Sequence, residues 1–167
     1  VDFDLVETSN LASQGYLEED LGKLKVQATA ALCRQINSRV EITAMPERFR
    51  RSMEIGNAIF CCVDKIDVRR LIWQAVGDQV SFYVDGRMSA EVLRVLTACD
   101  SESRQHYPRT LFRSDESFAG ACTAKTTIYC ANVAAGLMVA QFTKYLRQLP
   151  AEADIQINLL ASELSVG

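Results

Sequence analysis

Three apolar runs in this chain each end in an aspartate, a residue whose carboxylate can bind a ribose or a metal ion. The runs are Val1-Asp2-Phe3-Asp4, Phe60-Cys61-Cys62-Val63-Asp64 and Phe82-Tyr83-Val84-Asp85. In open α/β sheets ligands bind beyond the carboxyl ends of the strands, so aspartates placed there can hold a ribose hydroxyl or a cation bound to phosphates. The pattern predicts a nucleotide site, although Asp85, which precedes Gly86, is more typical of a turn residue.

The hydrophobic periodicity predicts alternating strands and helices around these aspartates. Residues 1–4 are typical of the end of a buried strand, and the polar stretch 5–22 predicts a long loop of the kind that is usually functional. Helices are expected over 23–36, 67–76 and 125–146, a short helix and a surface loop within 100–121, and strands over 40–44, 58–63, 80–84, 92–98 and 155–160.

The order of these elements predicts the fold class. The continuous apolar run 58–63 indicates a fully buried strand, and therefore a sheet that is parallel at its centre. The run 92–98 follows the preceding strand too closely for a helical crossover, which makes that pair antiparallel. We therefore expect an α/β protein in which a Rossmann-like parallel sheet continues into antiparallel strands.

Length and charge limit the class of protein. A chain of 167 residues with 49% apolar and 23% charged residues is typical of one globular domain, which would span residues 1–167. The formal net charge of −3 disfavours nucleic acid and anionic membranes as main partners. The apolar stretch 128–142 contains Asn132 and Gln141 and is shorter than the ~20 residues that a bilayer requires, which favours a buried helix over a membrane span.

The six cysteines indicate a reducing compartment. They form no Cys-x-x-Cys pair, and several lie in apolar runs where a reduced cysteine acts as a small hydrophobic residue. A structural zinc site needs clustered ligands, and the single histidine, His106, is expected in an exposed loop. The sequence therefore predicts a cytoplasmic protein and disfavours a cysteine-bound metal.

Several polar residues at fixed spacing resemble a known family. The first block is Asp2-Phe3-Asp4-Leu5-Val6-Glu7-Thr8-Ser9-Asn10-Leu11, followed by Gln14 and by Gly22-Lys23-Leu24-Lys25. Further along, Cys62-Val63-Asp64-Lys65 resembles a strand-end Cys-x-Asp-Asn motif, and Ala121-Cys122-Thr123 leads into a long apolar helix. Over most of its length the chain is similar to the ThiF/MoeB/HesA family of ubiquitin-activating-type adenylyltransferases.

The resemblance implies an activity, a partner and cofactors. Members of this family activate the C-terminal glycine of a ubiquitin-like or sulfur-carrier protein with ATP and Mg²⁺, which gives an acyl-adenylate and pyrophosphate. They commonly form homodimers, so a homodimer is expected here. Roles carried over to the matching residues are ribose binding for Asp2, nucleotide binding for Asp4 in the same motif, contacts beside the triphosphate for Asn10 and Gln14, phosphate contact for Lys25, and Mg²⁺ coordination for Asp64.

The chemistry of these residue types agrees with the roles that the resemblance implies. A carboxylate accepts two hydrogen bonds from a ribose, a lysine offers a compact charge to phosphate oxygens, and Mg²⁺ prefers one or two carboxylates together with phosphate oxygens. Cys122 matches a cysteine that in some relatives links covalently to the carrier or to a sulfur-transfer partner; a structural thiol is the alternative. The catalytic residues expected from the resemblance are Lys25, Asp64 and Cys122.

Two departures from the family pattern leave other functions open. Ser13 stands where well-known members have a phosphate-binding arginine, a loss that Lys23 could offset. The family's first strand, glycine-rich turn and first helix would precede Val1, so we expect this chain to lack that βα unit and to need it for catalysis. These departures favour a non-catalytic binding module as the alternative, and an NAD-dependent oxidoreductase is a weaker one because the block 10–25 argues against it.

Overall fold

The computed structural model describes residues 1–112 and 127–167, and these divide into two compact units. The first unit is Val1–Met53 and the second is Glu54–Gly167. Each unit has its own secondary structure.

The first unit is built from short helices. They are α1 (Thr8–Gln14), the 3₁₀ helix η1 (Glu18–Asp20) and α2 (Lys25–Ile36). Helix α1 begins after Glu7, whose N–H donates to the side-chain Oδ1 of Asn10 (2.9 Å), and it ends at Gly15, which adopts the left-handed conformation with φ 72°. An antiparallel bridge between Leu5 and Leu24 then brings the start of the chain beside the start of α2.

Three predictions for this unit need correction. The stretch 5–22 is not one long loop, because it contains α1 and η1. Residues 40–44 form no strand although their apolar residues alternate, because alternation makes a strand only where a neighbouring strand completes the hydrogen-bond ladder, and no described strand pairs with them. Residues 1–4 are extended and lie outside the sheet, and Val1 and Phe3 are exposed instead of buried. The predicted helix 23–36 is confirmed as α2.

The second unit is a mixed five-stranded sheet with helices on both faces, which confirms the predicted fold class. The strands are β1 (Ala58–Cys61), β2 (Phe82–Ser89), β3 (Val92–Ala98), β4 (Asp154–Asn158) and β5 (Glu163–Val166), and they lie in that order in the sheet. Strands β1 and β2 are parallel and are joined through helix α3 (Ile66–Val76), whereas every later pair is antiparallel.

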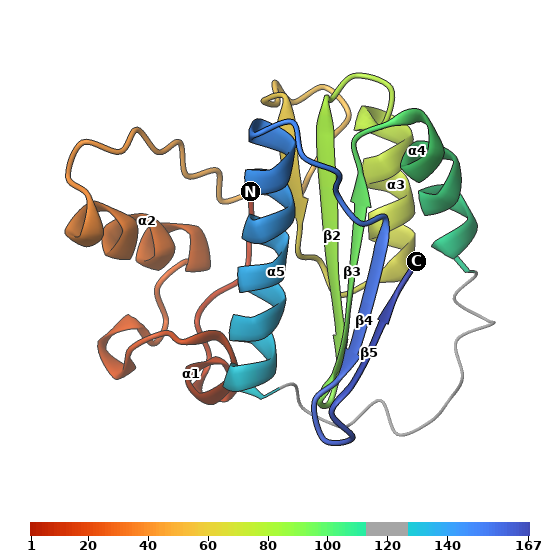
Figure 1. The fold of residues 1–167 in the computed structure, drawn as a ribbon. Helices are drawn as coiled ribbons and strands as arrows, with labels where there is room; N and C mark the ends of the chain where they lie inside the picture. The colour runs from red at the N-terminus through yellow and green to blue at the C-terminus, as the bar shows by residue number, and fades with distance from the viewer. Residues whose placement is uncertain (113–126) are drawn as a thin grey trace. The chain divides into compact units, whose positions relative to one another are not determined.

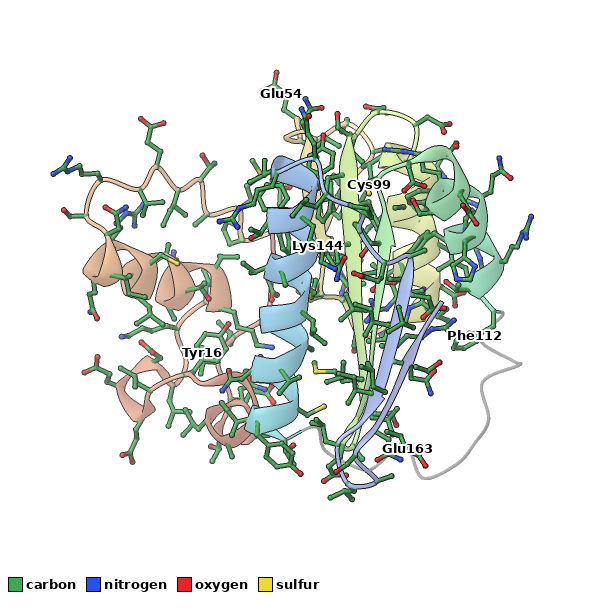
Figure 2. All side chains as sticks on the ribbon, in the orientation of Figure 1. Tyr16, Glu54, Cys99, Phe112, Lys144 and Glu163 are labelled. Carbon is green, nitrogen blue, oxygen red and sulfur yellow. The ribbon has the colours of Figure 1, made fainter. Side chains whose placement is uncertain are left out.

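The two faces of this sheet are covered by different helices (Figure 1). Helix α5 (Ile128–Leu146) packs on one face, where its buried residues Cys130, Ala134 and Met138 meet apolar residues of β2 and β3. Side chains fill the space between this helix and the sheet (Figure 2). Helix α3, helix α4 (Ser101–His106) and the 3₁₀ helix η2 (Tyr107–Thr110) cover the other face.

Three details of the sheet differ from the sequence prediction. The parallel pair lies at one edge of the described sheet instead of its centre, so β1 is half-covered and Phe60 is 41% exposed. Strand β2 continues past Val84 to Ser89, which makes Asp85 a strand residue and the predicted turn wrong. Strand β5 was not predicted, because Glu163–Val166 is short and exposed along its whole length.

Candidate functional site

The first candidate site lies at the start of the first unit, around Asp2 and Asp4. Oxygen Oδ1 of Asp2 accepts a hydrogen bond from the N–H of Asp4 (2.9 Å), and the N–H of Asp2 donates to the carbonyl of Met45 (3.1 Å). Next to them, the guanidinium of Arg48 lies 4.1 Å from the centre of the Phe3 ring. The backbone of Asp2 and Asp4 is therefore fixed while the Asp4 side chain stays 52% exposed.

Lys25 joins these carboxylates because the backbone folds the start of α2 onto residues 4–6. The N–H of Lys25 donates to the carbonyl of Asp4 (2.9 Å), and the N–H of Val6 donates to the carbonyl of Lys23 (2.8 Å). Lys25 Nζ then lies 3.4 Å from Oδ2 of Asp4, with the lysine side chain 12% exposed. The structure thus brings together Asp2, Asp4 and Lys25, three of the residues predicted to bind the nucleotide.

The other predicted residues of this unit have local partners. Oδ1 of Asn10 is used by the Glu7 N–H, while Gln14 is exposed at the end of α1. Ser13 Oγ donates back to the carbonyl of Ser9 (2.9 Å). Lys23 Nζ lies 2.9 Å from Oδ1 of Asp20, and this hydrogen bond raises the pKa of Lys23 and lowers that of Asp20. Lys23 is therefore already paired with a carboxylate.

Asp64 belongs to the second unit, in the segment between β1 and α3. Its side chain is exposed, and among the residues that the structure describes it has no hydrogen bond or ion pair. One exposed carboxylate that phosphate oxygens can supplement suits Mg²⁺, which keeps few protein ligands. Lys65 follows it where the similar family motif has asparagine. Cys122 lies outside the described residues.

A buried polar cluster, which we call the Asp85 cluster, lies under α3 and η2 and consists of Asp85, Arg69, Arg87, Tyr107 and Tyr83. Asp85 is fully buried. Its carboxylate forms an ion pair with Arg69 and accepts hydrogen bonds from Arg87 Nε (2.9 Å) and from the Tyr107 hydroxyl (2.8 Å). Two arginines and a phenol thus surround one carboxylate, whose Oδ2 is hydrogen-bonded and whose Oδ1 has the ion pair with Arg69.

The tyrosines of the Asp85 cluster remain neutral hydrogen-bond donors. Burial raises the pKa of Tyr83 and of Tyr107 above the usual phenol value. Because the Tyr107 hydroxyl already donates its hydrogen bond to Asp85, the Tyr83 hydroxyl is the donor in the 3.2 Å hydrogen bond between the two tyrosines. The ring of Trp73 on α3 packs edge-on against Tyr83, with ring centres 5.1 Å apart, and so covers the side of the cluster that faces α3.

The arginines of this cluster and its neighbour Arg70 pair with acidic side chains. Besides Arg69 and Arg87, Arg70 donates to Oδ1 of Asp67 (2.9 Å). Sequence reasoning missed the cluster because it ended β2 at Val84. The alternation of Tyr83, Asp85 and Arg87 with smaller or apolar residues was the signal that the strand continues.

The prediction for His106 was wrong. This residue ends α4 instead of lying in a loop, and its Nε2 lies 3.1 Å from Oδ2 of Asp154 on β4. Arg94 also donates to that carboxylate, through Nε at 2.8 Å. The three side chains join α4 to β3 and β4.

Metal-binding groups and membrane spans would indicate other kinds of function. Within residues 1–112 and 127–167, no three histidine, cysteine, aspartate or glutamate side chains are grouped so that they could hold a metal ion. Over the same ranges, no helix has the length and apolar character needed to cross a bilayer.

Comparison with known proteins decides the family. The model of the ThiF family matches residues 1–164, which is nearly the whole chain. The chain belongs to the ThiF family. The comparison with curated proteins finds no match.

Solved structures with the ThiF-type fold resemble this chain at low sequence identity. A crystal structure of PaaA has a TM-score of 0.73 at 16% identity, covering 99% of this chain and 62% of PaaA. The structure of E. coli MccB with ATP has a TM-score of 0.74 at 15% identity, covering 99% of this chain and 54% of MccB. MccB with AMPCPP and MccA gives 0.73 at 17% identity, again with 54% of MccB covered.

These likenesses establish the fold of this ThiF family member. The chain spans between about half and three fifths of the length of PaaA and MccB. It therefore has an adenylyltransferase-like nucleotide-binding fold, and membership of the ThiF family points to an enzyme of the adenylyltransferase type.

Proposed function

We propose that the protein transfers AMP from ATP to the C-terminal glycine of a ubiquitin-like or sulfur-carrier protein. The observation that carries the proposal is the grouping of Asp2, Asp4 and Lys25, in which a ribose-binding type of carboxylate lies beside a lysine suited to phosphate. ThiF family membership supports the reaction type, and the ATP and MccA named with MccB support the two substrate classes.

In the proposed reaction a carboxylate oxygen of the carrier attacks the α-phosphorus of ATP. A new phosphorus–oxygen bond forms, the bond to the bridging oxygen of the β-phosphate breaks, and pyrophosphate leaves with the electron pair. Asp2 accepts hydrogen bonds from the ribose, and Asn10 and Gln14 donate from their amides to phosphate oxygens. Lys25 stabilises the negative charge that grows on the phosphates in the transition state.

Lys25 can fulfil this role because its present partner is weakly held. A lysine–carboxylate pair at 3.4 Å with a half-exposed aspartate contributes at most about 1 kcal/mol. A triphosphate carries more negative charge than one carboxylate and competes well for the ammonium group. The lysine is thus kept in place by Asp4 until a nucleotide binds.

Magnesium is the cofactor of the proposed reaction, and Asp64 is the residue proposed to hold it. When bound there, Mg²⁺ would neutralise charge on the phosphates. Cys122 is proposed to attack the acyl-adenylate of the carrier: a thioester forms, the bond between the acyl carbon and the AMP oxygen breaks, and AMP leaves with the electron pair. A homodimer is the proposed assembly.

ATP–pyrophosphate exchange with the protein at its full natural length tests the function. Lys25→Met should lower exchange about a hundredfold, because a donor to the transition state is lost. Lys144→Met is the matched control, because Lys144 is also paired with a carboxylate, that of Glu152. This variant should catalyse ATP–pyrophosphate exchange at the normal rate. Asp64→Ala should abolish Mg²⁺-dependent exchange and leave the fold intact. Normal exchange in Lys25→Met would contradict the proposal.

A non-catalytic binding module is the second candidate. Ser13 stands where other family members have a phosphate-binding arginine, and its hydroxyl donates to the backbone, so this position supplies no guanidinium. This candidate predicts ATP binding without any pyrophosphate exchange, which equilibrium dialysis and the exchange assay distinguish.

A further inference from the structure

Both ends of the segment that carries Asp64 are attached to one residue, Asp85. At one end Cys61, the last residue of β1, pairs with Asp85 in the parallel register. At the other end the N–H of Arg69 donates to the carbonyl of Lys65 (3.1 Å), and the Arg69 guanidinium forms an ion pair with the Asp85 carboxylate. Asp64 lies between these two attachments.

We propose that Asp85 is a positioning residue which, through Arg69, fixes segment 62–65 and so sets where the Asp64 carboxylate meets a nucleotide-bound Mg²⁺. The inference rests on the proposed function, in which Asp64 holds the metal. Asp85 has no exposed surface, so it contacts neither metal nor nucleotide and acts entirely through its neighbours.

The orientation of the Asp85 carboxylate is fixed, which a positioning role requires. Its Oδ2 accepts from Arg87 Nε and from the Tyr107 hydroxyl, while its Oδ1 faces Arg69. Arg87 is fixed in turn, since its other two nitrogens donate to the carbonyl (2.8 Å) and to Oγ1 (3.0 Å) of Thr110. Rotation of the carboxylate would therefore break the two charge-assisted hydrogen bonds to Oδ2 and the ion pair of Oδ1 with Arg69.

The need to hold α3 on the sheet does not by itself explain the ion pair. Ile72 and Val76 already bury the apolar side of that helix, and apolar side chains in place of a buried ion pair are often equally stable. Apolar contacts are not directional, so they would allow the start of α3 to slide or rotate on the sheet, whereas an ion pair restricts both movements. Removing a group that orients a metal ligand without touching the metal commonly lowers metal affinity 10–100-fold.

Metal binding and hydrogen exchange in Asp85→Asn test this role in the protein at its full natural length. With a non-hydrolysable ATP analogue present, electron paramagnetic resonance should show Mn²⁺ affinity falling about tenfold or more. Amides of segment 62–65 should exchange faster by mass spectrometry. Asp154→Asn is the control: it breaks the pair with Arg94 on β3 and β4, and it should leave both readouts unchanged.

Native Mn²⁺ affinity in a folded Asp85→Asn protein would overturn the inference. If that variant does not fold, Tyr107→Phe removes one hydrogen bond from the same carboxylate and should weaken Mn²⁺ binding several-fold; no change there would overturn the inference equally. Asp64→Ala separates the two proposals. Undiminished Mn²⁺ affinity in Asp64→Ala would refute the metal role in the proposed function, whatever Asp85→Asn does.

Discussion

The two units each contain a carboxylate paired with a cation, and the two pairs differ in burial. In the first unit Asp4 and Lys25 meet at 3.4 Å with the aspartate 52% exposed. In the second unit Asp85 is fully buried and has Arg69, Arg87 and Tyr107 as partners. An exposed pair can exchange one partner for a ligand, whereas a buried pair cannot be opened without leaving a charge unpaired in a poorly polarisable interior.

The difference assigns separate tasks to the two units. The exposed pair suits a site that must accept and release a charged ligand, because water replaces the lost partner at little cost. The Asp85 cluster suits a framework that keeps one arrangement, because every change of partner costs several kcal/mol. Changing one residue of each pair tests whether burial really separates them.

Asp85→Ala should produce the largest effect. Removing this carboxylate leaves the buried Arg69 and the half-buried Arg87 without it, so the free energy of unfolding should fall by about 3–5 kcal/mol. Asp4→Ala removes the exposed carboxylate and should cost no more than about 1 kcal/mol. Urea unfolding of both variants measures the difference, and equal losses would show that burial does not distinguish the pairs.

Local periodicity predicted the parts of the fold that local chemistry determines. Helix α2 follows from apolar residues at helical spacing, and the antiparallel pairing of β2 with β3 follows from the short connection between them. A motif with fixed spacing placed Asp2, Asp4 and Lys25 in one group, and the structure brings these three residues together. In each case the signal lies within a short stretch of sequence.

Features that depend on distant partners could not be predicted in this way. The alternation at 40–44 indicated a strand, but a strand needs a neighbour, and sequence spacing does not show which segments become neighbours. Asp85 looked like a turn residue because a charge before glycine usually is one. Its burial depends on Arg69, Arg87 and Tyr107, which reach it from two different covering elements and from its own strand.

Asp154 lies between the two extremes and should give an intermediate, pH-dependent effect. Hydrogen bonds from Arg94 lower the pKa of this carboxyl below its usual value of 3.8. The Asp154 carboxyl therefore takes up a proton more readily in the unfolded chain than in the folded protein. The stability that ionised Asp154 contributes is complete above pH 3.8 and is lost as the pH falls through the lowered pKa of the folded protein.

Asp154→Asn should remove this contribution. The variant should be less stable than the parent at neutral pH by about 1–2 kcal/mol, and the gap should shrink as the pH is lowered from about 5 to about 2. Urea unfolding across that range measures it. A gap that stays constant with pH would mean that the Arg94 pair does not contribute through its charge.

Substitutions of Asn10 should give the smallest change in stability. They separate its hydrogen bond to the Glu7 N–H from its proposed contact with ATP. Its Oδ1 caps the Glu7 N–H, and α1 has only seven residues with none buried, so Asn10→Ala should cost about 0.5–1 kcal/mol and speed amide exchange in α1. Asn10→Asp keeps the acceptor oxygen and should preserve the helix. It also places a negative charge where the proposed function puts phosphates, so its affinity for ATP should fall by more than that of Asn10→Ala. If instead both variants bind ATP like the parent, Asn10 serves as a helix cap and takes no part in the exposed site.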